Sequence, residues 1–222
     1  MKERVIFSWS GGKDSTLALY ELMETGAYDI VALMTTITKD YDRISMHGVR
    51  TALLERQADA LGIKLEKALM SKGASIEDNE VMIRQVLERY CADGVKVNAA
   101  GDIYLEDVKK YKDDNLAKIG MEGLYPLWKK DSRQLARKFI GLGFRAVITC
   151  VDSTLLDGRM AGREYDESFL AELPAGVDPC GENGEFHSFV YAGPLFREEV
   201  RFKRGEIVVR DGRFHFCDLL PI

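Results

Sequence analysis

Apolar residues in the first half of the chain form short continuous runs that alternate with stretches of helical spacing. The runs that predict buried strands are 5–7, 30–36, 63–69 and 95–99. The stretches whose apolar residues recur three and four positions apart, and so predict helices, are 16–25, 49–61, 76–90 and 107–119. Gly26 and Gly62 follow the first two helices directly and are expected to end them.

This alternation of strand and helix predicts an α/β fold. Successive parallel strands need crossover connections, and these are right-handed and place helices over the sheet. We therefore expect a parallel sheet with helices on both faces in the first half of the chain.

The pattern changes after Pro126. A helix is expected at 132–141 and a strand at 146–151, and a glycine-rich, acidic stretch then continues to Glu185. Near the end, Asp211-Gly212 separates two strand-like runs, which is a strong hairpin signal. The second half is therefore expected to be a smaller α+β domain. We place the boundary near Leu127, giving domains 1–127 and 128–222.

Composition narrows the classes of function. The 222 residues are 46% hydrophobic, enough for a substantial core, and the net charge of -5 gives no uniform basic field for nucleic acid. No run approaches the roughly 20 apolar residues of a membrane span, and residues 1–20 lack signal-peptide order. We expect a cytoplasmic protein with no membrane partner and no direct nucleic-acid contact. The widely spaced cysteines are expected to be reduced and structural: Cys91, Cys150, Cys180 and Cys217.

The sequence VIFSWSGGKDSTLALY at 5–20 runs a strand through two glycines into a helix. Such a turn directs backbone N–H groups and the positive end of the helix dipole toward one point, which suits a phosphate chain. Lys13 adds a positive charge, the hydroxyls of Ser10 and Ser15 can donate hydrogen bonds, and Asp14 can cap the helix or hold a metal ion. The common mononucleotide loop GxxxxGK[ST] is excluded because Asp14 follows the lysine. The alternative is an ordinary turn without a ligand.

SGGKDS at the end of a first strand resembles the signature of the PP-loop ATP pyrophosphatase superfamily, whose members cleave ATP between the α and β phosphates. The resemblance implies a Rossmann-like (HUP-type) fold, with ATP and Mg²⁺ as cofactors. It places the β and γ phosphates against the loop residues, which are Ser10, Gly11, Gly12, Lys13, Asp14 and Ser15.

Three later stretches resemble the diphthine–ammonia ligase family within this superfamily. They are ISMHGVR at 44–50, GDIYLEDVKKYKDDNLAKIGMEGLYPLWKKD at 101–131, and DPCGENGEFHSFVYAGPLF at 178–196. With the loop, the resemblance spans nearly the whole chain. Phe186 and Ser188 stand where some members of the family carry Tyr and Thr, which affects individual hydrogen bonds only.

The resemblance implies an ATP-dependent, AMP-forming carboxylate–ammonia ligase. Its reaction amidates diphthine, a modified histidine on translation elongation factor 2, to diphthamide. A carboxylate resists attack by ammonia because it has no usable leaving group, so the family first forms an acyl-adenylate and releases pyrophosphate. Ammonia then displaces AMP. Since the two halves leave no room for a glutaminase domain, free ammonium is the expected nitrogen donor.

Candidate site residues follow from the motifs and from their places after strands. The catalytic candidates are Lys13, Asp14, Glu182 and His187. The nucleotide-binding candidates are Ser10, Gly11, Gly12, Lys13, Asp14, Ser15, His47, Gly101 and Asp102, with Asp14 also the metal candidate. The candidates for binding the substrate are Asp152, Glu182, Asn183, Glu185 and His187.

Several of these residues have a purely structural alternative. His47 and His187 can be core histidines, Asp102 and Asp152 can cap turns, and the glycines around Glu182 can serve only a turn. The acidic segment 157–185, with Tyr191 as an aromatic wall, suits a trimethylammonium group. It equally fits a solvated loop.

Two other functions stay open. A tRNA-modifying ligase or thiolase of the same superfamily would keep the loop, but a basic face and often paired cysteines are expected of it. A non-catalytic nucleotide-binding regulator would keep the sheet without needing the GENGE stretch at 181–185. The oligomeric state is also left open, including a homo-oligomer.

Overall fold

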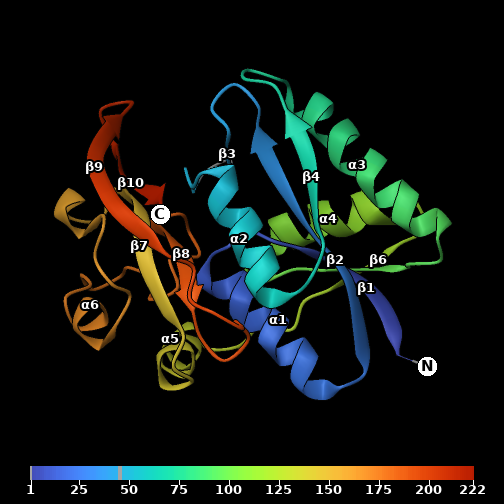
Figure 1. Cartoon of the computed structure of the whole chain (residues 1–222), viewed down its shortest axis with the longest axis horizontal. Helices are drawn as coiled ribbons and strands as arrows, with labels where there is room; N and C mark the ends of the chain where they lie inside the picture. The colour runs from blue at the N-terminus through green and yellow to red at the C-terminus, as the bar shows by residue number, and fades with distance from the viewer. Residues whose placement is uncertain (1, 45–46) are drawn as a thin grey trace. The chain divides into compact units, whose positions relative to one another are not determined.

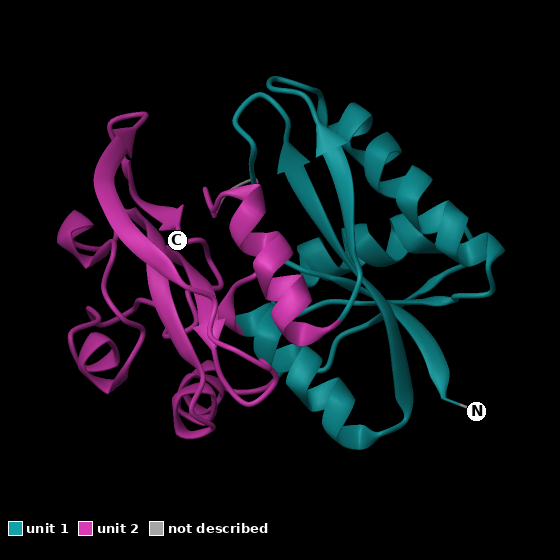
Figure 2. Ribbon diagram, in the orientation of Figure 1, with its two compact units in different colours: residues 1–10, 14–43, 63–129 teal, residues 11–13, 44–62, 130–222 magenta. Residues whose placement is uncertain are grey.

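The computed structural model describes residues 2–44 and 47–222. The chain divides into two compact units (Figure 2). Unit 1 contains residues 1–10, 14–43 and 63–129, and unit 2 contains residues 11–13, 44–62 and 130–222. The phosphate-loop motif therefore contributes residues to both units.

Unit 1 is built on a parallel sheet (Figure 1). Its strands are β1 (Glu3–Ser8), β2 (Tyr28–Thr38), β4 (Leu65–Met70), β5 (Val97–Ala99) and β6 (Glu122–Leu124). β1 lies between β2 and β5, β4 pairs with β2, and β6 pairs with β5, all in parallel. A two-residue strand, β3 (Arg43–Ile44), follows β2 in the chain.

Helices α1 (Lys13–Thr25), α3 (Ile76–Ala92) and α4 (Glu106–Ala117) accompany this sheet. Ser75 begins α3 with a capping box, in which its hydroxyl accepts from the N–H of Asp78 and the Asp78 carboxylate accepts from the Ser75 N–H. The sheet and helices bury a common apolar core, whose members are Ile6, Ala32, Met34, Ala68, Val86, Leu87, Val95, Leu116 and Met121. The expected α/β class with a mostly parallel sheet flanked by helices is confirmed.

Unit 2 is built on an antiparallel sheet of four strands in the order β8-β7-β10-β9. These are β7 (Arg145–Asp152), β8 (Phe186–Ala192), β9 (Phe202–Arg210) and β10 (Phe214–Pro221). The helical elements of the unit are α2 (Thr51–Leu61), α5 (Ser132–Gly141), the 3₁₀ turn η1 (Gly158–Met160) and α6 (Glu167–Ala171). Its core is aromatic: Phe139, Phe169 and Phe186 are fully buried, and Tyr165 packs against all three.

Most expected elements agree with the structure to within a few residues. The hairpin at Asp211-Gly212 is confirmed as the turn between β9 and β10, and the helix at 132–141 is confirmed. Both Gly26 and Gly62 end their helices with positive φ, 64° and 69°. One difference concerns the motif: α1 begins at Lys13 rather than residue 16, so Lys13, Asp14 and Ser15 form its first turn.

The sequence prediction missed strands β3, β6 and β8, helix α6 and the 3₁₀ turn η1. β6 has only three residues beside a glycine-rich turn, and α6 is a short helix inside the acidic stretch. β8 is buried along most of its length, so its residues show no alternation of polar and apolar positions. The expected domain limits at Leu127 stay a prediction. Among the described helices, none is long and apolar enough to span a membrane.

Candidate functional site

In unit 1, the first turn of α1 lies directly against the segment that follows β5. The Ser10 and Ser15 hydroxyl oxygens are 3.0 Å apart and hydrogen-bonded. A Cβ atom at Gly101 would stand 2.8 Å from the backbone carbonyl carbon of Asp14, so only glycine fits there. Gly101 was expected to bind nucleotide, and that contact stays a prediction.

Asp102 follows Gly101 and is held by a lysine from α4. Its two carboxylate oxygens each accept a hydrogen bond of 2.7 Å from the Lys112 ammonium, and its side chain is only 12% exposed. Asn98, the middle residue of β5, was not predicted. Its amide accepts from the Ser8 hydroxyl (3.0 Å) and donates to the Ile6 carbonyl (3.1 Å). A polar residue inside an apolar strand was the only signal that could have identified it.

In unit 2, Gly11, the first glycine of the loop, is held by Gln57, which was also not predicted. Gly11 has φ +74°, and its carbonyl accepts hydrogen bonds from the Val190 N–H (2.9 Å) and the Gln57 side-chain amide (3.0 Å). The same amide donates to the Val190 carbonyl at 2.5 Å. Gln57 is fully buried. This clamp fixes the turn to β8, and a side chain on Gly11 would collide with it.

Lys13 connects the loop to the GENGE stretch and the strand that follows it. Its backbone N–H donates to the Ser188 hydroxyl at 3.1 Å, and its ammonium donates to the Cys180 carbonyl. The ammonium also lies 5.2 Å from the ring centre of Phe186 and 5.6 Å from that of Tyr165. Cation–π attraction and a carbonyl therefore hold this buried charge.

His47 and His187 lie together beside Lys13. Their ring centres are 4.5 Å apart, and Nδ1 of His47 lies 3.2 Å from the Ser188 carbonyl oxygen. Because a carbonyl only accepts, Nδ1 carries the hydrogen and Nε2 keeps its lone pair. Burial lowers the pKa of His47 to about 4, with a further contribution from the Lys13 charge. Burial, His47 and Lys13 place the pKa of His187 well below its ordinary value. Both rings are therefore neutral at pH 7.

The GENGE turn at 181–185 is held from inside by Glu185. This buried carboxylate accepts from the backbone N–H groups of Asp178 (3.1 Å) and Asn183 (3.0 Å), and from the Asn183 side-chain amide (2.9 Å). The Asp178 carboxylate in turn accepts from the N–H groups of Cys180 and Glu182. Glu185 therefore shapes the turn, which is the structural alternative, while Glu182 is partly exposed and Asn183 exposed.

Asp152 also has a structural role. Its side chain is 2% exposed, and its carboxylate accepts from the Arg213 guanidinium and from the hydroxyl and N–H of Thr154. The hydrogen bond from Arg213 holds the pKa of this carboxyl well below its usual range. These bonds cap the turn after β7, and substrate contact by Asp152 stays a prediction.

Tyr191 does not present an exposed aromatic face, which corrects its expected role as an aromatic wall for a trimethylammonium group. It is buried in the sheet, and its hydroxyl donates to the Glu164 carboxylate at 2.9 Å. Burial raises its pKa to about 12.

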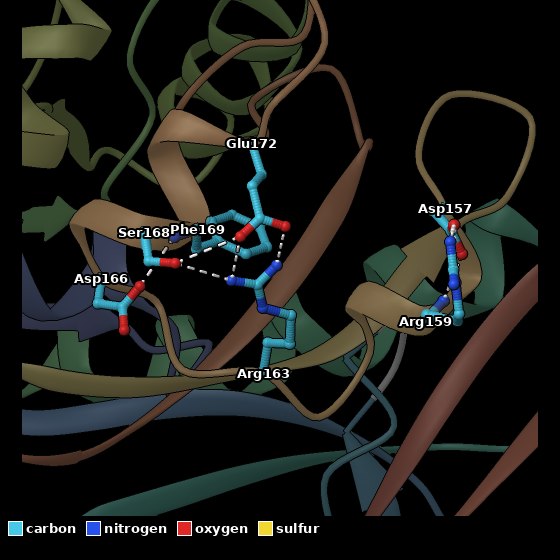
Figure 3. Close-up of polar contacts among 7 residues, drawn as sticks. All are labelled: Asp157, Arg159, Arg163, Asp166, Ser168, Phe169 and Glu172. Atoms are coloured by element: carbon cyan, nitrogen blue, oxygen red, sulfur yellow. Dashed lines mark hydrogen bonds and ion pairs between the residues drawn. The ribbon is translucent and has the colours of Figure 1, made fainter.

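Part of the acidic segment is engaged in local contacts (Figure 3). The Arg159 guanidinium pairs with Asp157 and holds the pKa of that carboxyl at about 2. Asp166 caps α6 by accepting from the Phe169 N–H at 2.8 Å. Arg163 forms a bidentate pair with Glu172. This part of the segment therefore follows the structural alternative.

The residues of the loop fit a phosphate chain by their chemistry. Ser10, Ser15 and Lys13 supply hydroxyl and ammonium donors at the beginning of a thirteen-residue helix. No group of three or more His, Cys, Asp or Glu side chains suited to a metal ion is present in the part of the chain that the structure describes. A magnesium ion at Asp14 would take its other ligands from phosphate and water, as is usual for this ion.

Comparisons with known proteins agree with the sequence resemblance. The family model for the diphthamide synthase N-terminal domain matches residues 2–123, and the model for the C-terminal domain matches residues 131–218. A diphthine–ammonia ligase of Danio rerio is 27% identical, with 93% of this chain and 89% of the relative covered. The diphthine–ammonia ligase of Homo sapiens is 26% identical, with 93% and 85% covered.

Among solved structures, a protein described as a predicted subunit of tRNA methyltransferase from Methanocaldococcus jannaschii is similar, with a TM-score of 0.46 and 18% identity. That alignment covers 89% of this chain and 100% of the other. The two family models together cover both halves of the chain, and the expectation of a ligase is confirmed with the family. The chain belongs to the diphthamide synthase family.

Proposed function

We propose that this protein is a diphthine–ammonia ligase that amidates diphthine on translation elongation factor 2 to diphthamide, using ATP and free ammonium. The proposal rests on family membership and on one observation above all. Lys13 of the phosphate loop is bonded through its N–H to Ser188 and through its ammonium to Cys180. The loop that suits ATP and the motif that distinguishes this branch of the superfamily therefore meet at one residue.

The proposed reaction has two displacement steps. A carboxylate oxygen of diphthine attacks the α phosphorus of ATP, and the bond to the β phosphate oxygen breaks, so pyrophosphate leaves. Ammonia then attacks the carboxyl carbon, and AMP leaves with the electron pair of the C–O bond. A proton is lost from nitrogen to give the amide.

The phosphate loop would act mainly in the first step. Negative charge grows on the departing pyrophosphate, and the Lys13 ammonium with the hydroxyls of Ser10 and Ser15 would stabilise it. Magnesium, when bound, would neutralise phosphate charge at Asp14. For this, the Lys13 ammonium must turn from the Cys180 carbonyl toward phosphate, which its four-carbon side chain permits.

The paired histidines fit the second step. Nitrogen attacks only as neutral ammonia, and a group that accepts a hydrogen bond from it orients its lone pair toward the carboxyl carbon. The Nε2 lone pair of His47 and the neutral ring of His187 would supply such acceptors beside Lys13, while their lowered pKa values make both rings too weakly basic to take a proton from ammonium. Glu182 and Asn183, at the surface of the GENGE turn, are the candidates for contact with the trimethylammonium group and carboxylate of diphthine.

The test is mass spectrometry of elongation factor 2 carrying diphthine after incubation with the protein, ATP, Mg²⁺ and ammonium. Replacement of OH by NH₂ lowers the mass by about one unit, and AMP should appear in equal amount. We expect Lys13→Ala to slow amidation by roughly a hundredfold or more. Lys110→Ala, which changes an exposed lysine of α4, is the matched control.

Formation of AMP without amidation of the factor would support cleavage of ATP at the SGGKDS loop but would reject diphthine as the substrate. ATP binding without cleavage on any tested substrate would favour the nucleotide-binding regulator. A mass change in tRNA rather than in the factor would favour the tRNA-modifying ligase.

A further inference from the structure

The outer strand of the unit 2 sheet exposes three adjacent apolar residues. β9 pairs only with β10 among the described residues and ends the strand order (Figure 1). Ile207, Val208 and Val209 are 47%, 45% and 50% exposed. An edge strand with apolar, β-branched residues offers N–H and C=O groups to any strand that pairs with it, and soluble proteins usually protect such an edge.

The sequence of this edge is complementary to itself. Residues 206–210 read Glu-Ile-Val-Val-Arg, with opposite charges at equal distances from Val208. If a second copy of β9 lies antiparallel with Val208 opposite Val208, each Glu206 faces an Arg210. Each Ile207 then faces a Val209. The five residues therefore give two ion pairs and three apolar cross-strand pairs.

The two faces of the strand also agree with this register. Side chains alternate between faces, so Glu206, Val208 and Arg210 share one face and Ile207 and Val209 share the other. In this register the first face brings opposite charges together around the Val208 pair. The second face brings apolar side chains together. A two-fold axis at a residue pair is compatible with either the hydrogen-bonded or the non-hydrogen-bonded site of an antiparallel ladder, because both are symmetric.

We propose that β9 is a self-association surface, on which two copies of the chain pair antiparallel through residues 206–210 to continue the sheet from one copy to the other. Charge complementarity selects a second copy over an unrelated strand, since the same five residues supply both halves of every pair. Directly opposed charge and β-branched pairs each stabilise an antiparallel sheet. Stable interfaces bury about 1,200–2,000 Å², and a five-residue edge is smaller, so we expect a concentration-dependent equilibrium between monomer and dimer.

The experiment is analytical ultracentrifugation of the full chain over a range of concentrations, with charge exchanges in β9. Glu206→Arg places two arginine pairs across the axis and Arg210→Glu places two glutamate pairs there. We expect each single variant to weaken dimerisation about tenfold or more. The double variant Glu206→Arg/Arg210→Glu restores both ion pairs in reverse, so it should dimerise with itself but not with the wild-type chain.

Two further variants keep the test decisive. Glu24→Arg makes the same change of charge on the exposed surface of α1 and should leave the equilibrium unchanged. Because the Arg210 guanidinium lies 5.4 Å from the Phe216 ring centre, its exchange can also affect the hairpin. Val208→Lys, at a half-exposed position, therefore serves in place of Arg210→Glu. It should abolish pairing because it places two lysines opposite each other on the two-fold axis.

A chain that stays monomeric at all concentrations overturns the proposal. So does a dimer that the single exchanges do not weaken, or one that Glu24→Arg weakens equally. Binding of elongation factor 2 that is lost with Val208→Lys, in a chain that never dimerises, would assign the edge to that partner instead.

Discussion

At the residue scale, the neutral state of His47 makes the stability of the protein depend on pH. Its folded pKa of about 4 lies below the ordinary value of 6.5. The unfolded chain therefore binds more protons between these two values, so stability is lost as the pH falls through this range. We expect the share from His47 to reach about 2 kcal/mol between pH 7 and pH 5.

Urea unfolding of the wild type and of His47→Gln at pH 7, 6 and 5 measures this share. The variant should lose less stability than the wild type between pH 7 and pH 5. Its stability at pH 7 is expected to start lower, because the substitution alters the hydrogen bond to the Ser188 carbonyl. Carboxylates contribute little to this comparison because most of them titrate below pH 5. Equal loss in both proteins would show that His47 is not held neutral.

The sequence marks those candidate site residues whose chemistry is local. Gly11, Lys13 and Ser15 follow one another along a strand, a turn and a helix, so a short motif is enough to find them. The residues that position the motif were not found, because their contacts are distant in sequence. Gln57 bonds to Gly11 and Val190, 46 and 133 positions away, and the pattern of helix α2 marks it only as one polar residue among apolar ones.

At the scale of elements, Gln57 links helix α2 to strand β8 and to the loop. Replacing it by leucine removes the donor to two buried carbonyls, those of Gly11 and Val190, and each such loss costs roughly 1–3 kcal/mol. We expect Gln57→Leu to lower the free energy of unfolding by about 2–4 kcal/mol and to lower the rate of amidation through the displaced turn.

Gln85→Leu is the control, because Gln85 is exposed on α3 and its change should lie within about 0.5 kcal/mol. Urea unfolding and the amidation assay are run on both variants. If the two variants behave alike, the clamp at Gly11 does not hold the loop.

The elements that the sequence predicted differ in their burial from the elements that it did not predict. Helices such as α3 and α5 show one apolar face and a polar face, and this period is visible in the sequence. The strand β8 and the three-residue β6 have no such period. β8 carries His187 and Ser188, so the second half of the site could be placed only by motif.

At the scale of the whole molecule, a bound nucleotide should raise the thermal stability of the chain. A ligand that binds only the folded protein stabilises it by about 2.7 kcal/mol at a hundred times its Kd. For a chain of this size that corresponds to a rise in Tm of roughly 5–10 °C. Because the SGGKDS loop is proposed to hold the β and γ phosphates, ATP and pyrophosphate with Mg²⁺ should each produce a rise, and AMP a smaller one.

Differential scanning calorimetry of the wild type, Lys13→Ala and Lys110→Ala tests this. Lys13 is buried against two aromatic rings, so its loss changes the Tm of the ligand-free protein as well. The informative quantity is therefore the rise in Tm on adding ATP, measured for each variant against its own ligand-free state. We expect a full rise in Lys110→Ala and a much smaller one in Lys13→Ala. An equal rise in both would mean that the phosphates are bound without this lysine, and its proposed role in pyrophosphate release would lose its support.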